Sequence, residues 1–586
     1  MKRTTRWRLA LAWLLLPLSA LAQEPMQAVK LQPGEQLRLD GTLAHPAWQR
    51  APVYDRFVEN DPVNGAAPPQ RTQVQVLFDD QALWVGVTAL DDEPGRIRDV
   101  PVRADQVNRT QDFVVVYVDA IGSRQSAQFF RVNAAGSTAD GLHTAADDSE
   151  DFAPDFDWDA ATARTPQGWT AVLRLPFASL RFAEGRHDWR IMVARRLPRE
   201  QFHLVASVPI PRDAASFIHT MQPLQGVALP AEHGFLTLRP SLTLRTARDG
   251  QGRKDGIDAS LDLKWRPRAE LVVDATLNPD FSQVALDVPQ LAGNTRFALS
   301  FPEKRPFFFE SADLLRSPTE AFYTRSFTAP RWGLRSTWRG PVWAGSGFVV
   351  DDRGGGFVLL PGAYGTDLVD QPASRTVAAR VLSDRSELKL GALAATRRYA
   401  AGAGSNDVIG ADAGWQIDGA WRARAQWLHS RTDAFVPERR DGDRVYAKLW
   451  RLTDDSEFNL AIDESSAGFR QDIGFVNQVG VRKTTVFGSR GWYGLAPFNG
   501  LFVNLQLEQV RDRSSGELVS QDLRPGLWAT AARNLEWWLE FRPQTLLRLG
   551  PGRPLLTERY VESGLTMTPA PWFPLIDTKL ATGRLA

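Results

Sequence analysis

The C-terminal part of the chain, from about residue 234 onward, consists of long segments in which apolar and polar residues alternate strictly. In one of them Trp421, Ala423 and Trp427 alternate with Arg422 and Arg424. A period of two places each set on one face of a β-strand. The segments follow one another through turn signals, so the pattern predicts a long antiparallel sheet. The same alternation is present at residues 236–245, 257–265, 269–277, 503–508 and 535–542.

Two architectures fit such a sheet: a soluble sandwich with its apolar face inward, and an outer-membrane barrel with its apolar face toward lipid. The segments run for ~9–11 residues, the length that a tilted strand needs to cross a bilayer. No helical crossover interrupts them, and aromatic residues such as Trp265, Trp427 and Trp450 stand at segment ends, where an interfacial girdle would hold them. Of the 20 Trp, 13 lie between Trp265 and Trp572. We therefore predict an antiparallel β-barrel of outer-membrane type over residues 234–586.

The N-terminus has the features of a secretory signal peptide over residues 1–22. Four basic residues precede an apolar stretch at residues 9–18, and Ala20-Leu21-Ala22 forms a small-x-small cleavage site. The apolar stretch is shorter than the ~20 residues of a spanning helix. We expect an exported protein in the outer membrane of a Gram-negative bacterium, with its N-terminal domain periplasmic or surface-exposed.

Residues 23–233 have a different pattern, that of short strands separated by turns. Residues 74–78 lead through Asp79 and Asp80 into residues 83–87, as in a hairpin with an acidic turn. Residues 113–118 form a nearly continuous apolar run, typical of a strand that is buried on both faces. Because helical periodicity is weak here, the sequence predicts a β-sandwich, and the whole chain is expected to be all-β.

Alternation fails between residues 278 and 311. An aromatic triplet, Phe307 to Phe309, lies beside Glu303, Lys304, Arg305 and Glu310. A lipid-facing strand cannot carry that many consecutive charges. We expect a surface loop with an aromatic anchor or a plug folded into the barrel lumen.

Both parts of the chain contain motifs of known families. The N-terminal part opens with Leu39-Asp40-Gly41-Thr42-Leu43 and Ala47-Trp48, and continues with Phe78-Asp79-Asp80, Leu83-Trp84-Val85-Gly86, Asp157-Trp158 and Gly168-Trp169. These motifs resemble carbohydrate-binding module family 9-like domains. The stretches Asn278-Pro279-Asp280-Phe281-Ser282-Gln283 and Phe301-Pro302-Glu303-Lys304-Arg305-Pro306-Phe307-Phe308 are similar to a barrel-like domain of unknown function that follows such modules in Gram-negative secreted proteins.

The resemblance implies a sandwich that binds polysaccharide or oligosaccharide, joined to a barrel held in outer-membrane lipid. It also implies roles in polysaccharide catabolism, including xylanase-like hydrolysis. One departure concerns the barrel. Outer-membrane barrels usually end in an aromatic residue, whereas this chain ends Gly583-Arg584-Leu585-Ala586. We therefore expect a barrel that is incomplete or that closes in another way.

Sugar binding requires an aromatic ring that stacks on a pyranose, together with polar groups that select its hydroxyls. Trp84 and Trp169 lie within strand patterns and are expected in the core. Trp158, between two aspartates, is the candidate for a loop platform. Asp155, Asp157 and Asp159 alternate in an acidic run and are candidate calcium ligands, as family 9-like modules can hold calcium. A solvated acidic loop is the alternative.

The sequence offers little for catalysis or for other partners. Glycoside hydrolysis needs two carboxylates that flank the bond. Glu303 and Glu310 are the pair to test, although pairing with Lys304 and Arg305 is the alternative role. Basic and acidic residues balance at 69 and 68, so we expect no nucleic-acid partner, and the lack of Cys excludes a Cys-ligated metal. The leading hypothesis is a non-catalytic, carbohydrate-binding outer-membrane barrel. The rival is a secreted glycosidase.

Overall fold

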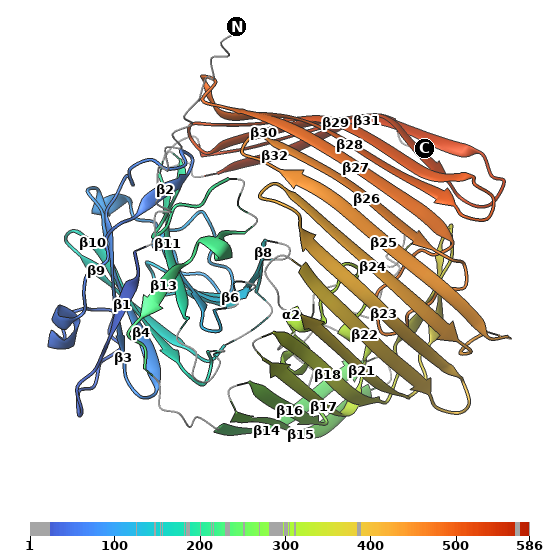
Figure 1. Cartoon of the computed structure of the whole chain (residues 1–586), viewed down its shortest axis with the longest axis horizontal. Coiled ribbons are helices and arrows are strands. Elements are labelled where there is room, and N and C mark those ends of the chain that lie inside the picture. Colours follow the sequence, from blue (N-terminus) through green and yellow to red (C-terminus); the bar gives the residue numbers. More distant parts are fainter. Residues whose placement is uncertain are drawn as a thin grey trace, which may run out of the picture.

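The computed structural model confirms an all-β chain with two parts, a β-sandwich and a large curved sheet (Figure 1). The structure describes residues 24–584, and the predicted signal peptide lies outside this range. Within the range, the following positions are not described: 123, 125, 146–147, 153, 155, 181, 183–187, 200, 213, 215, 229–234, 250–251, 269, 280–296, 298–299, 301–302, 304, 310–311, 341, 384–387, 437 and 569–574.

The sandwich consists of two sheets that face each other across one core. One sheet has the order β8-β7-β6-β5-β11-β13 and the other β3-β4-β10-β9, and β1 pairs with both β13 and β3. The strands are β1 (Met26–Lys30), β2 (Val58–Asp61), β3 (Thr72–Phe78), β4 (Ala82–Leu90), β5 (Phe113–Asp119), β6 (Ser126–Asn133), β7 (Thr138–Thr144), β8 (Ser149–Asp151), β9 (Asp159–Thr165), β10 (Gly168–Pro176), β11 (Arg190–Pro198), β12 (Phe202–Ala206) and β13 (Gln222–Gln225), with 3-10 turns η1 (Pro46–Arg50), η2 (Pro94–Arg96) and η3 (Phe217–Thr220).

Strand β5 lies at the centre of the sandwich and is buried along its whole length. Val114 and Val116 face the main core, where they join Trp169 of β10. Val115 and Tyr117, on the opposite face of β5, belong to a second cluster. The prediction of a strand buried on both faces is therefore confirmed, and each apolar face has its own covering layer.

The second part is one antiparallel sheet of 17 strands, which we call the barrel sheet. Its strands pair in chain order from β14 to β32, except that β19 and β20 form a separate hairpin. In the described residues the two edge strands, β14 and β32, do not pair with each other. The strands are β14 (Phe235–Asp249), β15 (Gly252–Arg268), β16 (Leu271–Leu277), β17 (Pro330–Arg339), β18 (Trp343–Asp352), β19 (Phe357–Pro361), β20 (Thr366–Asp370), β21 (Ser374–Ser383), β22 (Leu388–Tyr399), β23 (Ser405–Gln416), β24 (Trp421–Thr432), β25 (Arg440–Leu452), β26 (Ser456–Ser465), β27 (Val481–Tyr493), β28 (Phe498–Asp512), β29 (Leu518–Ala531), β30 (Leu535–Arg548), β31 (Leu555–Met567) and β32 (Ile576–Arg584).

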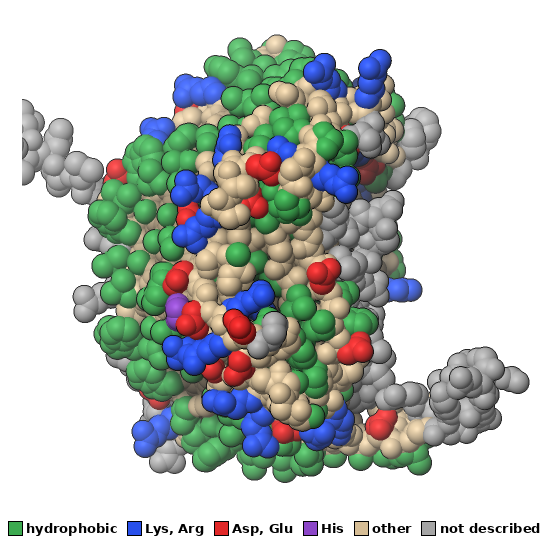
Figure 2. All heavy atoms as spheres, turned by 90° about the vertical axis from the view of Figure 1, so that its right-hand side faces the viewer, with side chains coloured by type: hydrophobic (Ala, Val, Ile, Leu, Met, Phe, Trp, Pro, Cys, Tyr) green, Lys and Arg blue, Asp and Glu red, His purple; other side chains and the backbone are tan. Residues whose placement is uncertain are grey.

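The barrel sheet has apolar side chains on its outer face, and its inner face carries polar side chains together with apolar ones that pack on the plug. On β17, Leu334 and Trp338 are each 45% exposed, whereas Arg335 and Thr337, which lie between them in the strand, are buried. The same relation holds on β24, where Trp427 is exposed and Gln426 is buried. Figure 2 looks onto one end of the sheet, with charged and polar residues toward the centre and hydrophobic side chains along the flanks. This polarity is the reverse of that in a soluble protein.

A segment between β16 and β17 fills the interior. We call its described residues from Glu303 to Ala329 the plug; it contains α1 (Pro306–Phe309), α2 (Ala312–Leu315) and the 3-10 turn η4 (Thr324–Ser326). Phe308 of the plug stacks on Phe327 and packs with the inward side chains Phe348 and Val350 of β18. The two alternatives predicted for residues 278–311 were a surface loop and a plug, and the described residues of this segment form a plug.

No helix among the described residues is both long and apolar enough to cross a lipid bilayer.

The two ends of the barrel sheet differ in the length of their connections. At one end the strands are joined by short turns at residues 340–342, 417–420, 453–455, 494–497 and 532–534. At the opposite end lie the long connections 278–329, 353–373 and 466–480.

The sandwich docks onto the short-turn end, on the left in Figure 1. Arg109 of the sandwich binds Glu536 at the start of β30, with 2.5 Å between Nη1 and Oε1. The amide of Asn534 donates to the carbonyl of Arg199, and the guanidinium of Arg212 lies over the ring of Tyr493 at the end of β27. These contacts place the sandwich across the short turns.

Candidate functional site

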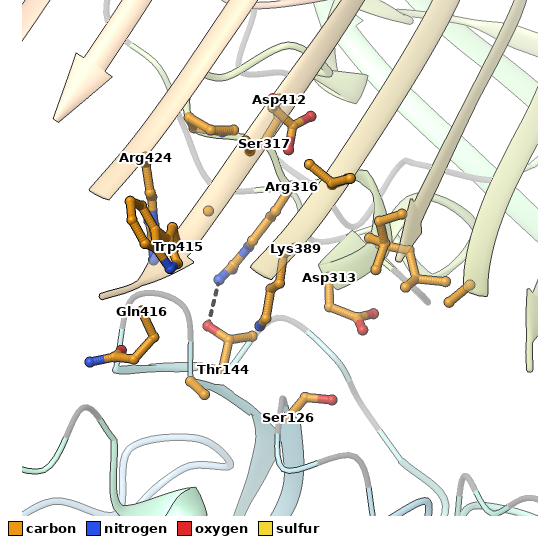
Figure 3. A pocket seen from close by; sticks show the side chains of 18 of the residues that line it. Ser126, Thr144, Asp313, Arg316, Ser317, Lys389, Asp412, Trp415, Gln416 and Arg424 are labelled. Atoms are coloured by element: carbon orange, nitrogen blue, oxygen red, sulfur yellow. Dashed lines mark hydrogen bonds between the residues drawn. The ribbon is translucent and has the colours of Figure 1, made fainter. Parts of the chain in front are cut away.

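A cavity of about 240 Å³ lies where the sandwich, the plug and the short-turn end of the barrel sheet meet. We call it the junction cavity. The sandwich contributes Ile121, Ser126, Thr144, Ala145 and His219, and the plug contributes Asp313, Leu314 and Arg316 to Pro318. Strands β17, β18 and β21 to β25 or their connecting turns contribute the remainder. In Figure 3 the side chains of Arg316 and Lys389 both point toward Thr144, which accepts a hydrogen bond of 3.2 Å from Arg316.

Among the residues that the structure describes, basic side chains outnumber acidic ones in the wall of the cavity. Two carboxylates, Asp313 and Asp412, line it. The cations that line it are Arg316, Arg339, Arg380, Lys389, Arg422 and Arg424. Asp148 and Asp151 of the sandwich lie close by, where Asp148 interacts with Arg422 and Asp151 with Arg316. When these two aspartates are added, the described cations still outnumber the described acids. The described part of the wall therefore carries more positive than negative charge.

Ion pairs hold part of this wall in place. Arg380 of β21 donates to Asp412 of β23 at 2.6 Å, and both side chains are more than nine-tenths buried. Arg339 of β17 binds both carboxylate oxygens of Asp313, at 2.8 and 2.9 Å. Buried ion pairs with good geometry fix side chains rather than add much net stability. Here the pair of Arg339 with Asp313 fixes the plug against β17, and the pair of Arg380 with Asp412 joins β21 to β23.

The indole of Trp450 forms one side of the cavity. It projects from β25 toward the interior, and the guanidinium of Arg424 lies 5.0 Å from its ring centroid. The ammonium of Lys448 lies 5.2 Å and the guanidinium of Arg422 6.0 Å from the same ring. Cation–π attraction therefore gathers three positive groups around one aromatic ring.

The positive charge affects titratable groups on the sandwich side. The imidazole of His219 keeps access to solvent, but the atoms packed around it lower its pKa. The charges of Lys389, Arg124 and Arg422 lower this pKa as well. Burial acts to raise the pKa of Asp148, but its hydrogen bonds with His143 and Ser216 hold that pKa below the ordinary value. At neutral pH the sandwich therefore presents a neutral His219 and an ionised Asp148.

The sandwich holds its tryptophans in two environments. Trp48, Trp84, Trp169 and Trp189 are buried, which confirms the core positions predicted for Trp84 and Trp169. Among the described residues Trp158 is the sandwich tryptophan that stays partly exposed, and its ring meets Phe130 edge-on at 5.2 Å. One edge of Trp158 thus belongs to the rim of the core and the remainder reaches solvent.

The candidate calcium ligands are only partly covered by the structure. Asp155 lies outside the described residues, and Asp157 and Asp159 are exposed. Asp159 pairs with Arg174 at 3.4 Å. In the part of the chain that the structure describes, no group of three His, Cys, Asp or Glu side chains is arranged to hold a metal ion.

The two candidate catalytic acids belong to the plug region. The carboxylate of Glu303 accepts hydrogen bonds from both Nε and Nη2 of Arg305, at 2.8 and 2.7 Å, and one of 2.6 Å from the hydroxyl of Thr324. Glu310 and Lys304 lie outside the described residues. The alternative pairing role of Glu303 with Arg305 is thus what the described atoms show.

The junction cavity was not predicted from the sequence. Arg422 and Arg424 were identified only as the polar face of an alternating strand. Arg422 and Arg424 pair with Trp450 and Lys448 of the next strand, so that three cations and one indole lie on the same face of a hairpin. This clustering is the sequence signal that could have identified the cavity wall.

Comparison with family models identifies one region of the chain. Residues 235–330 match the family model described as Domain of unknown function (DUF5916), which confirms the predicted resemblance of the C-terminal part to a domain of unknown function. No curated protein matches the chain.

Solved structures of both predicted kinds are among the similar ones. A carbohydrate binding module family 9 from Caldicellulosiruptor kristjanssonii in complex with cellotriose is 14% identical, with a TM-score of 0.25, over 35% of this chain and 95% of that one. Acinetobacter baumannii OccAB3 is 9% identical, with a TM-score of 0.29, over 80% of this chain and 98% of that one. Pseudomonas aeruginosa OpdK with vanillate is 10% identical, with a TM-score of 0.26, over 80% and 96%.

Proposed function

We propose that the chain is a non-enzymatic β-barrel protein of a Gram-negative outer membrane, and that it holds a carbohydrate-binding sandwich at the periplasmic end of a plugged barrel. The proposal has four parts: the membrane location, the orientation, the binding of carbohydrate and the lack of catalysis. Each has its own support and its own test.

The membrane location is supported by the reversed polarity of the barrel sheet. Leu242, Leu244 and Ile257 are 67%, 74% and 72% exposed on its outer face, whereas Arg335 and Arg397 are buried inside it. Apolar patches larger than a few hundred Å² are rare on soluble monomers, because each Å² left in water forgoes about 25 cal/mol. Alternation with apolar residues outward and polar residues inward is the signature of membrane β-barrels.

Fractionation of cells tests the location. We expect the mature protein to remain in the membrane pellet after carbonate washing and to migrate faster on a gel when it has not been boiled. Recovery in the soluble fraction, without a heat-modifiable shift, would show that the sheet is not embedded in lipid.

The orientation is supported by the unequal connections at the two ends of the barrel sheet. Outer-membrane barrels carry short turns on the periplasmic side and long loops outside. Because the sandwich docks on the short turns, it belongs on the periplasmic side.

Labelling of single cysteines tests the orientation, since the chain has no Cys of its own. Ser515→Cys lies in an exposed connection at the long-loop end, and Val100→Cys lies on the sandwich, where Val100 is 59% exposed. A membrane-impermeant maleimide should label Ser515→Cys in intact cells and Val100→Cys only after permeabilisation. The reverse result would place the sandwich outside.

Carbohydrate binding by the sandwich is supported by the family 9-like motifs and by Trp158, whose indole keeps access to solvent beside the exposed Asp157 and Asp159. An aromatic face next to polar groups is the arrangement that sugar rings require. On a glycan array, Trp158→Ala should lose binding and Trp158→Phe, which keeps an aromatic face, should retain part of it. Equal binding by all three proteins would remove Trp158 from the site.

The lack of catalysis is supported by the geometry of Glu303, whose oxygens are occupied by Arg305 and Thr324. A general acid must be free to give its proton to a glycosidic oxygen. We expect no release of reducing sugar from polysaccharides. Release that disappears in Glu303→Gln or Glu310→Gln would instead identify a glycosidase.

A further inference from the structure

The junction cavity has three properties that a ligand must match: a net positive wall, uncharged hydrogen-bonding groups and a small volume. The uncharged polar groups include the hydroxyls of Ser126, Thr144 and Ser317 and the amide of Gln416. The volume of about 240 Å³ lies below the roughly 300–1,000 Å³ of pockets for drug-sized ligands. A compact anion with several hydroxyl groups satisfies all three.

Buried charged side chains form part of the cavity wall, which distinguishes the cavity from a simple gap between domains. Arg380 is 5% exposed, and its Nε has no hydrogen-bond partner among the described residues. The same is true of Oδ2 of Asp412, the carboxylate that Arg380 binds through Nη2. Buried polar atoms without partners cost roughly 1–3 kcal/mol each, and both atoms belong to side chains that line the cavity.

Gly391 shows that the strands make room for this arrangement. It lies opposite Asp412 in the pairing of β22 with β23, and a Cβ on it would stand 2.6 Å from both carboxylate oxygens. The glycine therefore allows the carboxylate of Asp412 to lie flat against β22, where it meets Arg380 at the cavity wall.

We propose that the junction cavity binds a sugar acid, that is, a single pyranose that carries a carboxylate. Lys389, Arg422 and Arg424 supply the positive field for the carboxylate, and Ser126, Thr144 and Gln416 offer hydrogen bonds to the hydroxyls. The site is separate from Trp158, and the inference rests on the proposed function only in that the sandwich must be docked on the barrel. Arg316, which joins the plug to the sandwich at the cavity, couples the site to that docking.

The expected ligand differs from that of the sandwich in charge, so the two sites can be distinguished by chemistry. Hydroxyl groups alone would favour neutral sugars, and cations alone would favour any small carboxylate. The combination predicts that galacturonate binds more tightly than either galactose or acetate, because only galacturonate uses both sets of groups.

Calorimetric titration of the full-length protein in detergent micelles tests the proposal. We expect saturable binding of galacturonate, with galactose and acetate at least tenfold weaker. Lys389→Gln and Arg424→Gln should each weaken galacturonate binding about tenfold. Lys483→Gln is the matched control, since Lys483 pairs with Glu508 on β27 and β28 and does not line the cavity.

The outcomes are distinct. No binding of galacturonate at 10 mM, equal binding of galactose or acetate, or equal losses in Lys389→Gln and Lys483→Gln would each overturn the proposal. A heat-modifiable gel shift in every variant shows that the barrel has folded. If Trp158→Ala abolishes binding of neutral glycans but leaves galacturonate binding intact, the two sites are independent. If neutral glycans never bind, the sandwich function fails while the junction site stands.

Discussion

The guanidinium of Arg316, in the plug, lies 2.7 Å from the carboxylate of Asp151, on strand β8 of the sandwich. The pair joins the interior of the barrel to the domain outside it. Its partners are 38% and 24% exposed, so by itself the pair contributes at most about 1 kcal/mol.

Arg316→Ala should therefore loosen the docking of the sandwich without unfolding either part. We expect faster hydrogen exchange of the β8 amides and little change in the temperature at which the barrel loses its heat-modifiable shift. Mass spectrometry of exchanged peptides measures the first effect. Unchanged exchange at β8 would mean that the other interface contacts, such as Arg109 with Glu536, hold the sandwich alone.

Arg335→Ala should destabilise the barrel strongly. Arg335 is 1% exposed and binds Asp274 of β16 at 2.7 Å as well as the carbonyl of Phe307 in the plug. Its removal takes two charged hydrogen-bond donors away from the buried carboxylate of Asp274, and breaking a buried pair costs about 3–5 kcal/mol. Arg331→Ala, on the same strand, is the control, because Arg331 is 48% exposed in its pair with Asp351. The midpoint of urea unfolding in detergent should fall for Arg335→Ala and stay within about 1 kcal/mol for Arg331→Ala. Similar midpoints would show that the buried pair of Arg335 with Asp274 does not stabilise the barrel.

Leu505→Arg should impair membrane assembly, whereas Gln506→Arg should not. Leu505 is 52% exposed on the outer face at the middle of β28, and its neighbour Gln506 faces inward. An arginine on the lipid face near the midplane costs about 2–4 kcal/mol. The yield of heat-modifiable protein in vesicles measures assembly. Equal yields would show that this face does not meet lipid.

Binding of galacturonate should strengthen as the pH is lowered from about 7.5 to about 5.5. The pKa of His219 is lowered by its packing and by Lys389, Arg124 and Arg422, while Asp148 opposes them, so the imidazole is neutral at pH 7. A bound anion favours the imidazolium and raises that pKa, and affinity therefore rises as His219 takes up its proton. We expect a gain of roughly two- to fivefold, the range of an exposed ion pair. In His219→Gln the gain should vanish; its persistence would assign the titration to another group.

The strand pattern could be predicted from the sequence because it depends on neighbours two residues apart. Alternation at residues 421–427 is local, and it gave both the strand β24 and the side on which Arg422 and Arg424 lie. The buried positions of Trp84 and Trp169 followed from the same kind of pattern.

The junction cavity could not be predicted, since it depends on contacts between distant parts of the chain. Thr144, Arg316 and Arg424 meet there only because the plug extends through the interior and the sandwich covers the short turns. No local pattern carries that information. Likewise, the pairing of Glu303 with Arg305, two residues along the chain, was among the predicted alternatives, whereas the contact of Glu303 with Thr324 depends on the fold of the plug.

The position of the plug in the chain has a consequence for biogenesis. The plug lies between β16 and β17, so it is synthesised ahead of every strand from β17 to β32. These later strands supply the inward side chains that enclose it, such as Phe348 and Val350. Most of the wall that encloses the plug is therefore completed only after the plug itself has been synthesised.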